Sequence, residues 1–194
     1  GYCAPGTFAT PGEAQCHAVA PCPAGKWGDI PMTDDVQFVD ASAPSAGSDG
    51  SESMPWTKIS SAIAAAAPGA TIAVATGSYV GDLTVATKPV VIRGVCPDLV
   101  EIVGVGPAGA AILIKNGASK TEIRDVAVRG AGHGVALSGS TEVLLDRVWI
   151  HDADLNQVTV RRVARVLGAT PAALLAGASD VEKAFELVES GEKD

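Results

Sequence analysis

The chain has 194 residues and a formal net charge of −8; 47% of its residues are hydrophobic but only 4% are aromatic. This length can bury the core of one domain, and an acidic surface argues against binding to nucleic-acid phosphates or to anionic lipid. No window approaches 18 apolar residues, so no membrane-spanning helix is predicted, and the abundance of Ala, Val and Gly favours narrow layers of stacked strands.

Residues 1–31 form an irregular leader, rich in proline and glycine, that holds three of the four cysteines: Cys3, Cys16 and Cys22. A segment that cannot build its own core is where disulfides usually replace packing. With the fourth cysteine, Cys96, three pairings are possible, and the sequence alone does not distinguish them. We favour Cys3–Cys16, which would close the leader, and Cys22–Cys96, which would tie it to the rest of the chain.

Zinc binding by Cys16, His17 and Cys22 is the alternative for the leader, although the spacing fits no standard zinc motif. Disulfides require an oxidising compartment, so we expect a secreted or cell-surface protein. The chain begins at Gly1 without a charged and then apolar stretch, and we expect a signal peptide to have been removed or to lie upstream.

After the leader we expect a strand over 36–40, a loop over 41–53 and a helix over 55–67. The helix is predicted by apolar residues at helical spacing, and the Pro-Gly pair at 68–69 ends it. We expect this helix to cap the first of the strands that follow, because an uncovered strand edge invites aggregation.

From residue 69 onward, short apolar runs recur between glycine and aspartate turns. One series of runs begins at residues 72, 90, 112, 135 and 158, in steps of 18, 22, 23 and 23 residues. A period near 22 with two or three strands per repeat is typical of a parallel β-helix, in which stacked coils share one core. We predict an all-β fold: a right-handed parallel β-helix of four to five short coils that occupies 32–160 together with its N-terminal capping helix.

An antiparallel β-sandwich is the alternative, but it would not return to the same register at every repeat. In a β-helix, alternate residues of each strand face the interior. We expect the inward set to comprise Ile72, Val74, Ile92, Ile112, Ile114, Val135, Leu137, Leu145 and Val148.

Five short segments match the N-terminal sequence pattern of a known class of proteins. They are Phe-Val-Asp-Ala-Ser at 38–42, Gly-Ser-Asp-Gly-Ser at 47–51, Pro-Trp-Thr-Lys-Ile at 55–59, Ala-Pro-Gly-Ala-Thr-Ile at 67–72 and Gly-Ser-Tyr at 77–79. Together they resemble the opening of secreted right-handed β-helix proteins of the pectin-lyase-like class. The cysteine-rich leader and the run at 148–152 are similar to surface proteins and lipoproteins of myxobacteria.

This resemblance covers about residues 20–152. Enzymes of the class are polysaccharide lyases that carry Ca²⁺ ligands and a basic residue on successive coils, usually beyond the third. Most of those coils are missing here, so the resemblance implies the fold and not the activity.

The strongest cluster of ionisable residues lies on two neighbouring repeats. At a step of 22 residues, Arg124 stacks on Asp146, Asp125 on Arg147, and Arg129 on His151. Opposite charges that stack on neighbouring strands favour a surface charge ladder. The alternative is a small acid–base or Ca²⁺ site that also includes Asp152, with Asp146, Arg147 and His151 as catalytic candidates.

Two further groups of residues are candidates for binding. Asp40, Asp49 and Glu52 could collect a Ca²⁺ ion by loop closure, although their spacing fits no compact calcium loop. Trp149 is the one aromatic in the regular coils beyond Tyr79, so we expect it to contact a ligand if it points outward. No other cofactor is indicated.

The tail, residues 161–194, is predicted to be a small helical cap on the last coil. Val160, Val163 and Leu167 form one helical stripe, and residues 159–177 are similar to the last two helices of phage-repressor-type helix-turn-helix domains. From Asp180 onward the tail is acidic, which opposes DNA binding.

We therefore predict a non-catalytic extracellular β-helix module that is surface-associated and binds a glycan or a protein. The partners would be a polysaccharide or a cell-surface protein, and not nucleic acid. The alternatives are a truncated or degenerate polysaccharide lyase-like enzyme and a purely structural surface repeat. The sequence indicates no oligomeric state.

Overall fold

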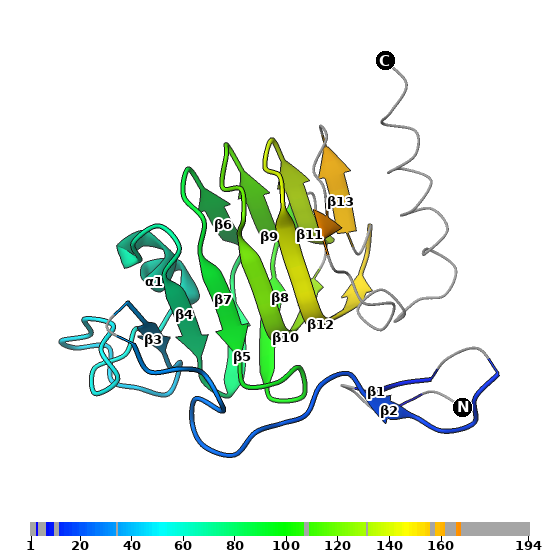
Figure 1. Ribbon diagram of the computed structural model, residues 1–194, viewed down its shortest axis with the longest axis horizontal. Coiled ribbons are helices and arrows are strands. Elements are labelled where there is room, and N and C mark those ends of the chain that lie inside the picture. The colour runs from blue at the N-terminus through cyan, green and yellow to red at the C-terminus, as the bar shows by residue number, and fades with distance from the viewer. Residues whose placement is uncertain are drawn as a thin grey trace.

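The computed structural model describes residues 3, 7–9, 12–33, 35–106, 109–130, 132–155, 158–161 and 166–167. They form a mostly β protein, a parallel β-solenoid of about three turns with a single short helix in the described part (Figure 1). Three turns connect β4 (Thr71–Val74), β7 (Val91–Gly94), β10 (Glu122–Gly130) and β12 (Val143–Ala153), which stack side by side. The predicted β-helix is therefore confirmed as a parallel solenoid, but the expected four to five coils are too many.

The strands form two stacks of parallel neighbours. The first sheet adds β3 (Gln37–Val39) and β14 (Val166–Leu167) at its two ends, and its branch contains β5 (Gly77–Val80) and β8 (Val100–Gly104). The other sheet contains, in order, β6 (Leu83–Ala86), β9 (Ala110–Lys115), β11 (His133–Ser138) and β13 (Val158–Arg161). β9 and β11 pair in parallel, with Ile112 opposite Val135, so the β-sandwich alternative is wrong.

The turns differ in length, which corrects the predicted series of strands. Ile92 lies beside Ile72, and Ile123 lies beside Ile92, so the second of these steps along the chain is much longer than the first. The predicted series of strand starts at 72, 90, 112, 135 and 158 therefore mixes the two sheets. Its first two members lie in the first sheet, whereas Ile112 lies in the other sheet, opposite Leu83 of the preceding coil. The step is constant only beyond this point, where Ile112, Val135 and Val158 are in register and equally spaced along the chain.

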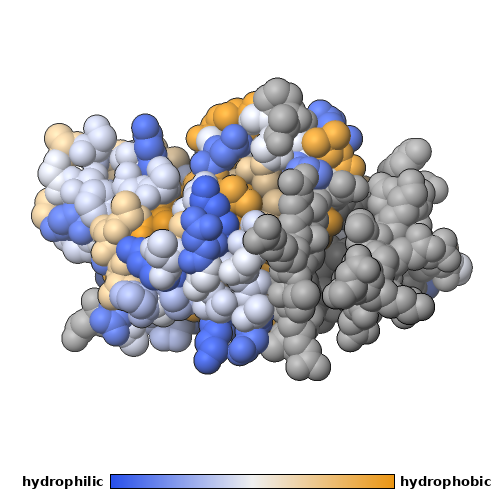
Figure 2. Space-filling model, turned by 90° about the horizontal axis from the view of Figure 1, so that it is seen from above, coloured by the Kyte–Doolittle hydropathy of each residue, from blue (hydrophilic) through white to orange (hydrophobic). Residues whose placement is uncertain are grey.

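The interior of the solenoid is filled by aliphatic side chains. Every member of the predicted inward set is at most 2% exposed. The turns that follow β6, β9 and β11 are more polar, and Figure 2, which looks down on this side, shows hydrophilic side chains across its middle. Burial of alternate strand residues in one continuous core explains why stacked coils are stable where a single coil is not.

Helix α1 (Ile59–Ala65) covers the first coil, as expected, but is shorter than the predicted 55–67. Ile59, Ala62 and Ile63 are buried against β3, β4 and β6. Trp56 is not helical, because its backbone N–H donates to Phe38 O and it forms a parallel bridge to Val39.

The leader contains a short antiparallel pair, β1 (Thr7–Phe8) and β2 (His17–Ala18). Disulfides join Cys3 to Cys16 and Cys22 to Cys96, which is the pairing favoured from the sequence. Cys16 and Cys22 are therefore bonded to other cysteines and not to a zinc ion. In the described part of the chain, no helix is long and apolar enough to cross a membrane.

The tail differs from the predicted helical cap wherever it is described. Val158–Arg161 is a strand, as the repeat predicted. Val166–Leu167 is also a strand, so the helical stripe through Leu167 is wrong. The remainder of the predicted helical cap, at 162–165 and 168–194, lies outside the described residues.

Candidate functional site

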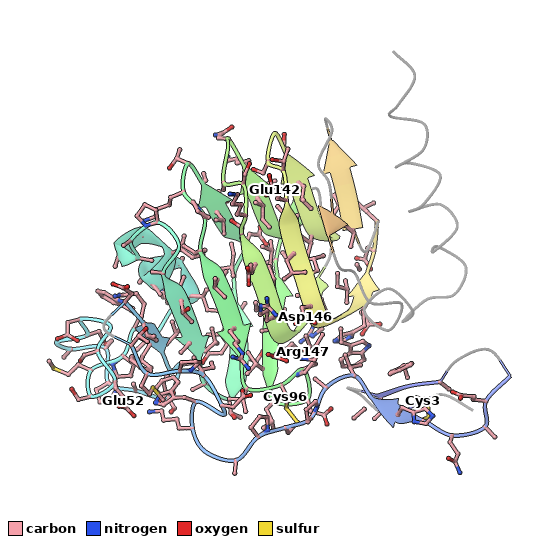
Figure 3. The ribbon with its side chains drawn as sticks, in the orientation of Figure 1. Cys3, Glu52, Cys96, Glu142, Asp146 and Arg147 are labelled. Carbon is pink, nitrogen blue, oxygen red and sulfur yellow. A yellow bond between two sulfur atoms is a disulfide. The ribbon has the colours of Figure 1, made fainter. Side chains whose placement is uncertain are left out.

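The predicted charge ladder lies on the outer face of β7, β10 and β12. β10 and β12 each bend at one residue, Asp125 and Arg147, and both residues have left-handed backbone, with φ of 56° and 51°. The strands pair on either side of the bend, with Arg124 opposite Asp146 and Val126 opposite Val148. The two bends therefore stack at one corner of the solenoid (Figure 3).

Ion pairs run without a break along this corner. Arg147 binds Asp125 through two hydrogen bonds, Nε to Oδ1 at 2.5 Å and Nη2 to Oδ2 at 2.9 Å. Asp125 Oδ2 also accepts from Arg93 Nε at 3.1 Å, and Asp146 Oδ2 accepts from Arg124 Nη1 at 2.6 Å. These contacts confirm the two predicted pairs, Arg124–Asp146 and Asp125–Arg147. We call Arg93, Arg124, Asp125, Asp146 and Arg147 the charge ladder.

The charge ladder places each of its carboxylates against two arginine side chains. The Asp125 side chain is 5% exposed and is enclosed by two guanidinium groups. The hydrogen bonds to Asp125 raise the pKa of Arg147 above its ordinary value. Asp146 and Arg147, proposed as catalytic candidates, are thus engaged with opposite charges. This arrangement favours a structural role, since a general base needs a free lone pair that faces its substrate.

His151 and Trp149 lie farther along β12. Their rings stack with centroids 3.8 Å apart and planes 17° apart. His151 Nδ1 is 2.9 Å from Asp152 Oδ2, whereas Nε2 is buried, 3.7 Å from Glu101 Oε1 and without a hydrogen-bond partner. Arg129, expected to stack on His151, donates to the same Glu101 oxygen at 2.8 Å, and the register of β10 and β12 shifts at this point. The geometry offers no open path to Nε2, which a base would use.

Two of the three Ca²⁺ candidates, Asp40 and Asp49, are engaged with other groups. Asp40 is buried, and its Oδ2 lies 2.7 Å from Lys26 Nζ. Burial raises the pKa of Asp40, but hydrogen bonds from Lys26 and Ser42 outweigh this effect and hold the pKa below its ordinary value. Asp49 Oδ1 accepts from the Ser51 backbone N–H at 2.9 Å.

A depression of about 330 Å³ next to Asp40 is lined by Lys26, Ser42, Ala75 and Thr76, and neither Asp49 nor Glu52 contributes to it. Glu52 is exposed. In the described ranges, no group of three or more His, Cys, Asp or Glu residues is placed to hold a metal ion.

Comparison with known proteins finds similarity in the C-terminal part of the chain. The family model of the outer membrane lipoprotein carrier protein LolA matches residues 145–194. The outer-membrane lipoprotein carrier protein of Methylibium petroleiphilum is 76% identical over 41 residues, 21% of this chain and 20% of that protein. Its counterpart in Leptothrix cholodnii is 66% identical over 41 residues, 21% of this chain and 19% of that protein.

A third relative, the carrier protein of Dechloromonas aromatica, is 49% identical over 49 residues, 25% of this chain and 24% of that protein. The chain therefore spans about a fifth to a quarter of the length of these curated relatives. No solved structure matches the chain.

These relatives correct the predicted function and partners. They are named as lipoprotein carriers, and not as glycan-binding modules, polysaccharide lyases or cell-surface binding proteins. Of the expected resemblance to the pectin-lyase-like class and to myxobacterial surface proteins, the structure bears out the parallel β-solenoid alone, and the matching family model and these relatives are lipoprotein carriers. The repressor-like interpretation of 159–177 is also replaced, because the carrier family covers this stretch. The sequence does contain a sign of this second family. The strand repeat ends after residue 160, where the sequence analysis predicts a helical cap.

Proposed function

We propose that this chain binds lipoproteins outside the cytoplasm, with residues 145–194 as the lipoprotein-binding segment and the solenoid as its support. The observation that carries the proposal is the match of these residues to the lipoprotein carrier family. We call residues 145–194 the carrier-like segment. Such a role needs binding and release, and no catalytic residue.

The carrier-like segment is continuous with the solenoid in a way that supports this proposal. It begins inside β12, whose residues pair with β10 from Leu144 to Ala153. β13 and β14, which belong to the same segment, pair in parallel with β11 and β12. Each described strand of the segment therefore adds to a solenoid sheet, which would give the segment a firm base.

The packing of the solenoid restricts where an acyl chain could bind. Its inward side chains, such as Ile102, Ile114 and Ile123, are completely buried against one another. An apolar ligand needs an apolar cavity, and the depression beside Asp40 is lined mainly by polar residues. We therefore assign acyl binding to the carrier-like segment, where the sequence supplies Leu174, Leu175, Val181, Phe185 and Val188.

The disulfides fit a location outside the cytoplasm. Cys22–Cys96 and Cys3–Cys16 need an oxidising compartment in which to form and persist. A carrier of outer-membrane lipoproteins would work between the two membranes of a bacterial envelope. We accordingly propose a periplasmic location.

Binding of a synthetic triacylated lipopeptide to the full-length chain tests this function. We expect saturable binding in a fluorescence anisotropy titration, and no binding of the same peptide without its acyl chains. Phe185→Asp should weaken binding at least tenfold. Val80→Asp is the matched control, because Val80 is 73% exposed on the solenoid and should leave binding unchanged. Equal effects of the two variants, or no binding by the native chain, would refute the proposal.

A further inference from the structure

Residues 22–30 of the leader cross the outer face of the first sheet, and we call them the strap. Trp27 and Ile30 of the strap are each only 4% exposed. They pack with Phe38, Ala73 and Ala75 on the sheet, and the Trp27 and Phe38 rings lie 4.8 Å apart. Because the alanines are small, they leave room for the indole. The strap thus covers an apolar strip on a face that would otherwise contact water.

The strap is held in place by side-chain contacts and by one disulfide bond. Its backbone hydrogen bonds are internal, from Gly28 N to Gly25 O and from Ile30 N to Trp27 O, and none of those found in the described chain joins it to a strand. Lys26 pairs with Asp40, and Asp29 Oδ1 lies 2.6 Å from Arg93 Nη2. Lys26 and Asp29 are half-exposed or more, so solvent weakens both ion pairs.

The covalent bond is the disulfide between Cys22, at the start of the strap, and Cys96, in the turn after β7. Figure 3 shows this bond where the leader passes the lower edge of the sheet. The two cysteines differ in exposure, because Cys22 is exposed whereas Cys96 is completely buried. Cys22 is therefore the more accessible side of the bond for a thiol in solution.

We propose that the strap is a redox-controlled cover, which opens when a dithiol reduces the Cys22–Cys96 bond. One thiolate of the dithiol attacks Cys22 Sγ, which forms a mixed disulfide and releases Cys96 as a thiolate that takes up a proton. The second thiol of the dithiol then attacks the mixed disulfide, releases Cys22 as a thiol and leaves the dithiol oxidised.

Opening would expose the apolar strip and separate Asp29 from Arg93. A segment without backbone pairing belongs to the least stable part of a fold, which opens without global unfolding. When the strap detaches, the solenoid should keep its core and its strand pairing. Phe38, Ala73 and Ala75 belong to a cluster of buried residues that is separate from the interior of the solenoid.

The sequence offers a specific probe of this opening. Lys26 is the first lysine or arginine of the chain, and the next is Lys58. Within residues 1–57, trypsin can therefore cut only after Lys26, and a protease needs a locally unfolded stretch to act. The rate at which trypsin cuts the peptide bond between Lys26 and Trp27 therefore reports how often the strap opens.

The test compares two full-length double variants, Cys22→Ser with Cys96→Ser and, as the matched control, Cys3→Ser with Cys16→Ser. The first variant, like the native chain in dithiothreitol, should be cut after Lys26 at least tenfold faster than the oxidised native chain. The control variant should be cut at the native rate. Both variants should keep the far-ultraviolet circular dichroism of the native chain. Equal cleavage rates in the two variants, or loss of β signal in the first alone, would overturn the proposal.

Discussion

Asp125 and Arg147 stack directly on each other at the corner of neighbouring coils, both with left-handed backbone and joined by two hydrogen bonds. Left-handed backbone is unfavourable for a residue with a side chain, most of all for one as large as arginine. The two hydrogen bonds join the side chains of both residues at this corner, where neither residue is glycine.

Removal of the charge from Asp125 should destabilise this corner. Asp125→Asn keeps the size of the side chain and tolerates left-handed backbone, but leaves Arg93 and Arg147 without their shared anion. Because the arginines are partly exposed, we expect the free energy of unfolding to fall by about 1–3 kcal/mol, less than for a fully buried pair. Urea denaturation would measure this, with exposed Asp49→Asn as a control that leaves the midpoint unchanged. A loss below about 0.5 kcal/mol would show that the pairing contributes little.

Ile114 should be far more sensitive to truncation than its neighbour in β9. Ile114 is completely buried in the interior, whereas Leu113 faces outward and is partly exposed. Ile114→Ala should therefore lower the free energy of unfolding by about 2–5 kcal/mol through lost burial and the cavity that remains. Leu113→Ala serves as the control and should cost less than half as much. Similar losses in both variants would mean that the facing of β9 is wrong.

Two buried hydroxyl groups should respond in opposite directions to replacement by alanine. Ser140 is completely buried and its Oγ has no partner in the described structure, whereas Thr121 Oγ1 donates to Ala118 O at 2.8 Å. Ser140→Ala should be neutral or stabilising by up to about 1 kcal/mol, and Thr121→Ala should be destabilising by about 1 kcal/mol. Thermal unfolding would compare them, and a clear loss of stability in Ser140→Ala contradicts the assignment.

Tyr79 should make the protein sensitive to alkali. Burial raises the pKa of Tyr79 to about 12, and its hydroxyl donates to Ala75 O at 2.8 Å. A raised pKa means that the neutral form is favoured in the folded state. Its stabilisation is thus complete below the ordinary value of 10 and is lost as the pH rises through about 12. Tyr79→Phe should remove this part of the pH dependence, as measured by urea denaturation across the interval from the ordinary pKa to the raised one. An unchanged slope in the variant contradicts this cause.

The interior of the solenoid could be predicted because large aliphatic residues recur at alternate positions of its strands, which places Ile72, Ile114 and Leu137 inside from the sequence alone. The ion pair of Asp125 and Arg147 could be predicted because β10 and β12 keep one constant register up to Val128 opposite Ile150. The number of turns could not, because the longer step from Ile92 to Ile123 breaks the period.

The end of the chain shows a different limit. Val160, Val163 and Leu167 fit a helical stripe, yet residues 158–161 and 166–167 are strands. Pairing with β11 and β12 overrides the local preference, since an exposed strand edge supplies partners that a short isolated helix lacks. The predicted function was wrong for a related reason. The resemblance that suggested it covered the solenoid, whereas the match to a lipoprotein carrier covers residues 145–194.

Native mass spectrometry of the full-length chain mixed with a triacylated lipopeptide tests the central claim most directly. The account predicts a one-to-one complex that forms without detergent, survives Val80→Asp and is lost in Phe185→Asp. A native chain that forms no complex, or one that keeps the lipopeptide equally well in both variants, would contradict lipoprotein binding by residues 145–194.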